Sequence, residues 1–170
     1  MTDFIVRKAS IEDTNIIYHN LKLCSENMLK EQGLEHWIPV YSIESIEKDI
    51  NEKNVFIVEY KEKIIGNFTV YSGLNDLWKD NWFYEKSINN IYVSKLCIIP
   101  EYSKHGFGKM CMQYIEEFCL NNKYNCICLD VYDKAIHAIN FYKKIGYEII
   151  GNASTRRFNV LLMKKDLNNE

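Results

Sequence analysis

The chain has 170 residues, of which 47% are apolar and 26% are charged, and its formal net charge is −2 at pH 7. This length and balance are typical of one globular domain, spanning residues 1–170, with enough interior for a proper core. Because nucleic-acid-binding domains usually carry a basic excess, the charge argues against nucleic acid as a partner.

The N-terminus lacks the basic segment and apolar run of a signal peptide. No apolar stretch approaches the ~20 residues that a membrane span needs. We therefore expect a cytoplasmic protein with no membrane partner. The 6 cysteines include no Cys-x-x-Cys pair, and the 4 histidines are scattered without metal-ligand spacing. The cysteines are therefore predicted to be reduced core residues, and no metal site is predicted.

The first part of the chain predicts helices and a hairpin. Ser10 and Asp13 form a capping-box pattern at the start of a helix, and Gly33 ends it. A charged turn separates two β-rich segments, which indicates an antiparallel hairpin. The elements expected here are a strand at 4–9, helices at 10–31 and 42–51, and strands at 55–60 and 63–71.

A long polar stretch, residues 73–90, follows the hairpin. Loops of this length in a compact domain tend to be functional. Its aromatic side chains, which include Trp78 and Trp82, either line a pocket or pin the loop to the core. The sequence leaves both interpretations open.

The middle of the chain predicts a strand, a glycine loop and a helix in direct succession. Residues 91–93 lead into an apolar strand that stops at Pro100, and the loop after it carries Gly106 and Gly108. Apolar residues at helical spacing form one face, namely Phe107, Met110, Cys111, Tyr114, Ile115 and Phe118. The first N–H groups of a helix lack internal partners and attract anions, which predicts a phosphate site here. The alternative is that the two glycines are plain architecture.

The last third predicts one more helix and three strands. Residues 126–131 are a nearly continuous apolar run with the single acid Asp130, which is typical of a buried strand. A helix at 135–144 follows, and then strands at 147–151 and 158–164. Because a strand, a helix and another strand follow each other in the middle, we expect one parallel pair. The predicted fold class is an α/β protein with a mixed sheet covered by helices.

Two segments, read together, resemble the acetyl-CoA-binding core of the GNAT N-acetyltransferase superfamily. The family's loop has the form Gln/Arg-x-x-Gly-x-Gly/Ala. The segment Lys104–Lys109, which comes after the strand Leu96–Ile99, matches the two glycine positions of this form with Gly106 and Gly108. The family's later helix carries Ala-x-x-Phe/Leu-Tyr-x-x-x-Gly-Phe, and Ala138–Tyr147 follows that pattern. The order of elements matches over essentially the whole chain. The resemblance implies a GNAT-like fold, with a mostly antiparallel central sheet, one parallel pair and helices on both faces.

The resemblance implies acetyl-CoA as co-substrate and no metal. The residues that would contact it are Leu96, Cys97 and Ile98 through their main chain, the loop residues Ser103, Lys104, His105, Gly106, Phe107, Gly108 and Lys109 at the pyrophosphate, and Ala138. Two positions depart from the family pattern. Ser103 stands where a Gln or Arg usually opens the loop, and Ala135 stands where an Asn is frequent. Neither change removes the backbone cradle of the loop.

Two residues are candidates for proton transfer. By the resemblance, Tyr142 would donate a proton to the departing thiolate; without it, Tyr142 would be a core aromatic. Asp130 matches the place where protein N-terminal acetyltransferases of the superfamily can carry a catalytic Glu. Desolvation in an apolar strand would raise the pKa of Asp130, which suits a base. Asp130 could instead tether a neighbouring turn, and an ordered water or the loop acids Glu85 and Asp76 are alternative bases.

The implied activity is acetyl transfer to a primary amine, most simply that of a small molecule. Mild net acidity is compatible with a cationic acceptor. Candidate walls of the acceptor site are Trp37, Trp78, Trp82 and Tyr92. A protein N-terminal or lysine acetyltransferase is one alternative, and a non-catalytic acyl-CoA-binding sensor is another. The sequence leaves the oligomeric state open between monomer and homodimer.

Overall fold

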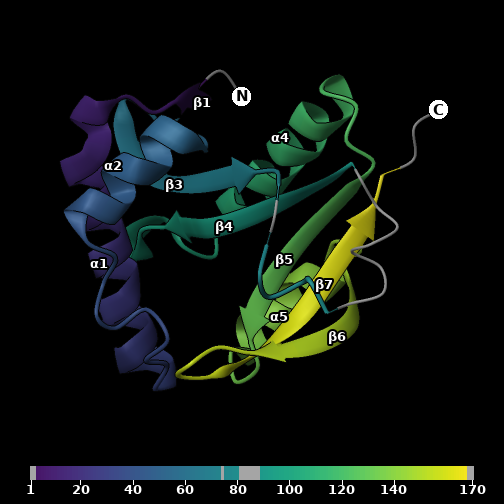
Figure 1. Ribbon diagram of the computed structural model, residues 1–170. Coiled ribbons are helices and arrows are strands. Elements are labelled where there is room, and N and C mark those ends of the chain that lie inside the picture. Colours follow the sequence, from purple (N-terminus) through teal and green to yellow (C-terminus); the bar gives the residue numbers. More distant parts are fainter. Residues whose placement is uncertain (1–2, 74, 81–88, 168–170) are drawn as a thin grey trace. The chain divides into compact units, whose positions relative to one another are not determined.

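A computed structural model of the chain describes residues 3–73, 75–80 and 89–167 (Figure 1). The strands and helices expected from the sequence are present, with small shifts at their ends. In chain order they are β1 (Phe4–Lys8), η1 (Ile11–Asp13), α1 (Thr14–Gln32), α2 (Ile43–Glu52), β2 (Asn54–Tyr60), β3 (Lys63–Tyr71), β4 (Asn90–Ile98), η2 (Pro100–Tyr102), α4 (Phe107–Asn121), β5 (Cys126–Tyr132), α5 (Ile136–Lys144), β6 (Glu148–Ser154) and β7 (Asn159–Asp166).

The strands form a 7-stranded mixed sheet in the order β1-β2-β3-β4-β5-β7-β6, and β4 with β5 is the parallel pair. This confirms the predicted fold class. By its internal contacts the chain divides into two compact units. The first unit is Met1–Val70 with Ser94–Tyr114, and the second is Tyr71–Val93 with Ile115–Glu170. The expectation of a single domain over residues 1–170 stays a prediction.

The helix boundaries of the first unit follow from local chemistry. The backbone N–H of Ser10 donates to the Asp13 carboxylate at 2.8 Å, which is one half of the predicted capping box. Helix α1 ends at Gly33, whose φ of 67° is left-handed and suits a residue without a Cβ. Helix α2 begins after Ser42, whose hydroxyl accepts a hydrogen bond from a first-turn N–H at 3.2 Å.

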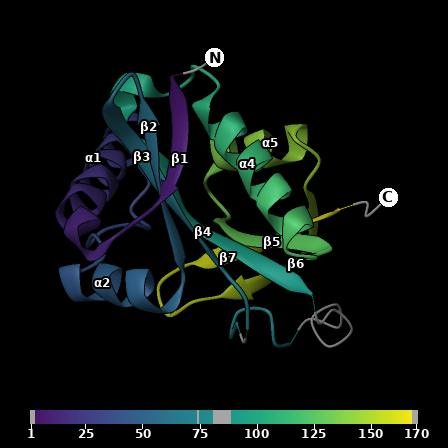
Figure 2. The ribbon, with the colours of Figure 1, turned by 90° about the horizontal axis from the view of Figure 1, so that it is seen from above.

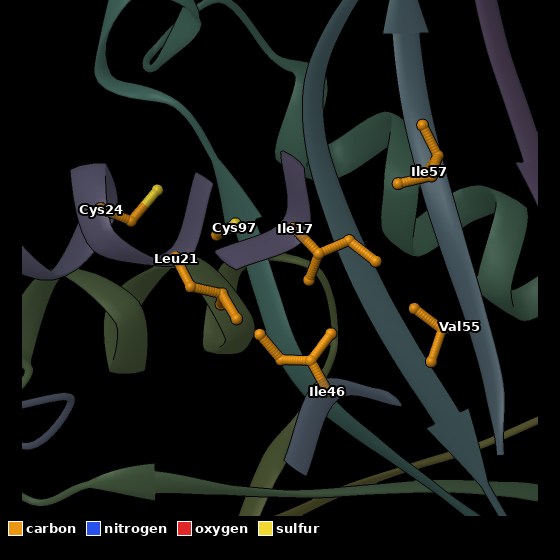
Figure 3. Close-up of a cluster of buried hydrophobic side chains, with 7 residues drawn as sticks. All are labelled: Ile17, Leu21, Cys24, Ile46, Val55, Ile57 and Cys97. Carbon is orange, nitrogen blue, oxygen red and sulfur yellow. The ribbon is translucent and has the colours of Figure 1, made fainter. Parts of the chain in front are cut away.

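Helices cover both faces of the sheet in the first unit. Helices α1 and α2 lie on the same side of β2 and β3 (Figures 1 and 2). Apolar side chains from both helices, β2 and β4 form one buried cluster there (Figure 3), which consists of Ile17, Leu21, Cys24, Ile46, Val55, Ile57 and Cys97. Phe56 alternates with Val55 and Ile57 and therefore points to the other face. There the rings of Phe56 and Phe68 lie 5.6 and 6.1 Å from the ring of Tyr114 in α4.

The second unit is built around β5. Strand β4 pairs with it in parallel through residues 90–92, and β7 pairs with it antiparallel along its whole length. One face of these strands carries a second buried cluster, made of Trp78, Tyr92, Cys126, Cys128, Val160 and Leu162. On the other face Lys165 of β7 binds Glu116 of α4 at 2.7 Å and the Ile145 carbonyl after α5 at 2.9 Å. These bonds hold the two helices against the strands.

All 6 cysteines are buried, as predicted, and their thiols are free. None of the helices in the described part of the chain is long and apolar enough to cross a lipid bilayer.

Candidate active site

In the strand segment Leu96–Ile98, the central side chain is buried. The Cys97 side chain is only 4% exposed and packs in the cluster beneath α1. A hydrogen bond with the Cys24 thiol, together with burial, raises the pKa of the Cys97 thiol well above its ordinary value. Cys97 therefore stays protonated at neutral pH and is a poor nucleophile. What it can supply to a ligand is its backbone.

The loop after β4 is folded by its own side chains. Strand β4 ends at Ile98, and η2 turns the chain at Pro100. The Ser103 hydroxyl donates to the Pro100 carbonyl oxygen at 2.9 Å, so this side chain closes the turn. Lys104 and Gly106 have left-handed φ angles of 63° and 87°. Gly106 needs no Cβ for packing, and a Cβ built there would meet no atom within 4 Å.

The loop leads directly into the N-terminus of helix α4. Helical hydrogen bonding in α4 begins where the Met110 N–H donates to the Gly106 carbonyl at 3.1 Å. The N–H groups of Phe107, Gly108 and Lys109 therefore lie in the first turn, where the positive end of the helix dipole is located. Lys104, His105 and Lys109 are exposed around them. This combination of backbone donors, dipole and cations is suited to phosphate oxygens.

Aromatic rings hold the start of α4 against β1 and β2 within the first unit. The Phe107 ring lies 4.8 Å from Tyr60, 6.0 Å from Phe4 and 6.2 Å from Tyr102. These residues come from β1, β2, η2 and the first turn of α4. Such ring contacts add to the burial of apolar area. They fix where α4 begins, and with it the direction of the first N–H groups.

Tyr142 lies on α5 in the second unit and is half-buried. Its ring is 5.1 Å from that of Phe141 and 5.6 Å from that of Tyr147. The Tyr147 N–H also donates to the Tyr142 carbonyl at 3.0 Å. Ala138 precedes Tyr142 by one helical turn and shares its face. Ala135 is the N-cap of α5 and makes no side-chain cap.

Asp130 lies near the end of β5, and its side chain reaches solvent. It shares a sheet face with Tyr132, since alternate residues of a strand point the same way. Desolvation by the surrounding protein atoms raises the pKa of the Asp130 carboxyl above its ordinary value. A hydrogen bond from its own backbone N–H opposes this increase. Both expected roles of Asp130, as a base or as the tether of a neighbouring turn, stay predictions.

The predicted acceptor walls lie in different surroundings. Trp37 is half-buried in the connection between α1 and α2, where its ring lies 6.2 Å from that of Tyr41. Trp78 is fully buried, and its ring is 5.8 Å from that of Tyr92, which is 2% exposed. Such burial is what the loop-pinning interpretation predicts for Trp78. Trp82 lies outside the described residues.

Sequence reasoning missed a group of polar side chains beneath β4. Asn67 of β3 is 1% exposed and bonds both to the Lys95 carbonyl and to Asn20 of α1. Lys95 forms an ion pair with Asp49 of α2. The pair Gly66-Asn67 inside an apolar strand was the available signal, because a glycine in a strand often marks a close backbone approach.

The fold and the site together define the class of protein. It is a mixed α/β protein in which a central strand leads through a glycine loop into a helix N-terminus suited to phosphates. A model described as the Acetyltransferase (GNAT) family matches residues 21–147. The chain therefore belongs to the GNAT acetyltransferase family and is an acyltransferase, as the sequence resemblance implied.

Solved structures have the same fold at low sequence identity. The ribosomal-protein-S18-alanine N-acetyltransferase from Escherichia coli is 12% identical, with a TM-score of 0.75 over 98% of this chain and 96% of that one. The PaiA N-acetyltransferase from Thermoplasma acidophilum, solved with coenzyme A, is 19% identical, with a TM-score of 0.74 over 96% and 98% of the two chains. The aminoglycoside acetyltransferase AAC(6')-Ib, also solved with coenzyme A, is 17% identical, with a TM-score of 0.72 over 96% and 94%.

Proposed function

We propose that this protein transfers the acetyl group of acetyl-CoA directly to a primary amine, most simply that of a small molecule. The observation that carries the proposal is the continuous run from β4 through the open Gly106 turn into the first turn of α4. Its backbone donors are suited to a pyrophosphate, and the strand before it offers main chain to a pantetheine arm. Solved GNAT structures with coenzyme A support the same co-substrate.

Different segments of the chain bind different parts of acetyl-CoA. Main-chain groups of Leu96–Ile98 bind the pantetheine arm and polarise the acetyl carbonyl. The loop from Lys104 to Lys109 holds the pyrophosphate through its N–H groups and cations. Ser103 contributes by closing the turn through Pro100, because its hydroxyl is already engaged there. Ala138 adds an apolar contact from α5.

Asp130 and Tyr142 are the proposed proton-transfer residues. Acyl transfer needs an uncharged amine as nucleophile, and an Asp130 carboxylate with a raised pKa can accept the proton that the amine loses. The Tyr142 hydroxyl donates a proton to the departing thiolate. Direct transfer is favoured over a cysteine acyl-enzyme because every thiol of the chain is buried. Burial raises the pKa of Cys111, for example, to about 12.

The acceptor class rests on the sheet face that carries Asp130. A carboxylate and the ring pair Tyr132–Phe158, whose centroids are 5.1 Å apart, offer a charge and aromatic faces to an alkylammonium group. Small-molecule amines and protein amines both fit this description. Neighbours of each kind exist, namely the aminoglycoside enzyme and the S18-alanine enzyme. We place small molecules first and a protein N-terminal or lysine acetyltransferase second.

Calorimetric titration with acetyl-CoA, CoA and ATP tests the co-substrate. Tight binding of acetyl-CoA together with much weaker binding of ATP supports the proposal, and no binding of acetyl-CoA overturns it. A panel of polyamines, amino sugars and short peptides, assayed for CoA release, then tests the acceptor. Turnover with any amine excludes the non-catalytic sensor. Acetyl-CoA binding without turnover, unaltered in a Tyr142→Phe variant, supports the sensor instead.

A further inference from the structure

Strand β4 is kinked at Lys95, directly before the residues assigned to the acetyl group. The Lys95 φ angle is 51°, which places a residue with a Cβ in the left-handed region. L-residues disfavour this conformation, and it persists only where the surroundings hold it. The question is therefore which contacts hold the kink, and what the kink does.

The first contact is the side-chain amide of Asn67. Its Nδ2 donates to the Lys95 carbonyl oxygen at 3.2 Å. Its Oδ1 accepts from the Cys97 thiol at 3.4 Å and from the Asn20 Nδ2 at 3.3 Å. The amide thus bonds the strand on both sides of Leu96, and Asn20 of α1 holds the amide itself.

The second contact is the Lys95 side chain, which reaches helix α2. Its ammonium group forms an ion pair with the Asp49 carboxylate and lies 4.4 Å from the centre of the Tyr41 ring. The Lys95 and Asp49 side chains are only 11% and 9% exposed, so water screens the pair weakly. Lys53, the residue directly after α2, binds the same carboxylate at 3.0 Å. A charged anchor thereby connects the kink to α2 and to the connection before it.

These contacts determine the orientation of one peptide plane. The Lys95 carbonyl and the Leu96 N–H belong to the same planar trans peptide. Fixing the carbonyl on Asn67 therefore fixes the direction of the Leu96 N–H. At the other end of the segment, the Cys24 thiol donates to the Ile98 carbonyl at 3.3 Å. Gly66 lies so close to Cys97 that there is no room for a side chain between the strands.

We propose that Asn67 and the Lys95–Asp49 pair are positioning residues for acetyl transfer, because they hold the main chain of Leu96–Ile98 in the orientation that polarises the acetyl carbonyl. The inference rests on the proposed function. It adds that α2 and Tyr41, which do not belong to the co-substrate loop, act on the reaction through Lys95. Donors held in advance stabilise developing charge without reorganising during the reaction.

The two lysines on Asp49 provide a matched test. Lys95→Met removes the anchor on β4 but leaves the Asp49 carboxylate paired with Lys53. Lys53→Met removes the other cation and leaves the anchor in place. Asn67→Asp keeps the size of the side chain and its acceptor oxygen, and it loses the donor to the Lys95 carbonyl. Each variant is compared with the wild type for thermal unfolding, kcat, acetyl-CoA KM, and the ratio of acetyl-CoA to CoA affinity.

We expect kcat to fall by about 10²-fold in Asn67→Asp and by roughly tenfold in Lys95→Met, since a small displacement of reacting groups is costly. CoA affinity should change little, while the preference for acetyl-CoA over CoA should decrease. Lys53→Met should stay within about twofold of wild type. Infrared spectra of bound acetyl-CoA should show a smaller shift of the thioester carbonyl stretch in the first two variants.

The two hypotheses fail in different ways. A wild-type protein that neither binds nor uses acetyl-CoA overturns the proposed function, and the positioning role with it. An active wild type alongside folded Asn67→Asp and Lys95→Met variants of unchanged kcat and carbonyl stretch overturns the positioning role alone. Equal losses in Lys95→Met and Lys53→Met also overturn it, because a general effect on α2 then explains both. If Asn67→Asp does not fold, the lysine pair decides.

Discussion

Replacing Gly66 by Ala is expected to destabilise the protein, although Ala usually strengthens a strand relative to Gly. The added methyl group would overlap the Cys97 carbonyl oxygen and lie 2.8 Å from the Cδ1 atom of Ile98. The oxygen belongs to the backbone of β4, so the strands themselves must move. Overpacking of this kind costs about 1–3 kcal/mol. Ala loses less conformational entropy on folding than Gly, which offsets about 0.5–1 kcal/mol of this cost.

The net loss should be about 1 kcal/mol in the free energy of unfolding, which corresponds to a fall of about 2–4 °C in Tm for a chain of this size. Urea unfolding followed by tryptophan fluorescence measures it. The displaced Cys97 backbone should also weaken acetyl-CoA binding. Gly33→Ala is the control: the left-handed φ costs about 1–2 kcal/mol there, but a Cβ meets no atom within 4 Å, so acetyl-CoA binding should persist. A Gly66→Ala variant as stable as wild type would refute the close approach of the two strands.

Three further outcomes are expected. Tyr142→Phe should lower kcat by about 10²-fold without changing CoA affinity, as calorimetry and steady-state kinetics would show, because only a proton donor is lost. If Asp130 is the base, kcat/KM should increase with pH through its raised pKa, and Asp130→Asn should abolish this limb of the pH profile. The same variant should be more stable than wild type at neutral pH. A carboxyl whose pKa is raised in the folded state destabilises the folded protein as the pH increases through its titration. The Arg7 guanidinium, by hydrogen bonding to Asp13, lowers the pKa of that carboxyl. The stabilisation from this pair is therefore present above the ordinary pKa and is lost as the pH falls through the lowered pKa. In Arg7→Met, the free energy of unfolding, measured by chemical unfolding at a series of acidic pH values, should depend less on pH.

Much of the loop could be predicted because its signals are local. Glycine at 106 permits a left-handed turn, and the apolar spacing from Phe107 onward defines a helix face, so the start of α4 follows from neighbouring residues. The role of Ser103 was less accessible. Its hydroxyl closes the η2 turn through Pro100, and only the folded loop shows that this side chain is occupied.

The order of strands and helices, their approximate ends and the membership of the GNAT family were determined by the sequence alone, because periodicity, caps and motif spacing are properties of nearby residues. Tertiary structure decided the rest. Asn67 reaches Lys95 across 28 positions, and Lys95 reaches Asp49 across 46. Nothing in the local pattern of either residue indicates its partner. Side chains so far apart in sequence acquire a shared role only when the packing of α1 and α2 on the strands brings them together.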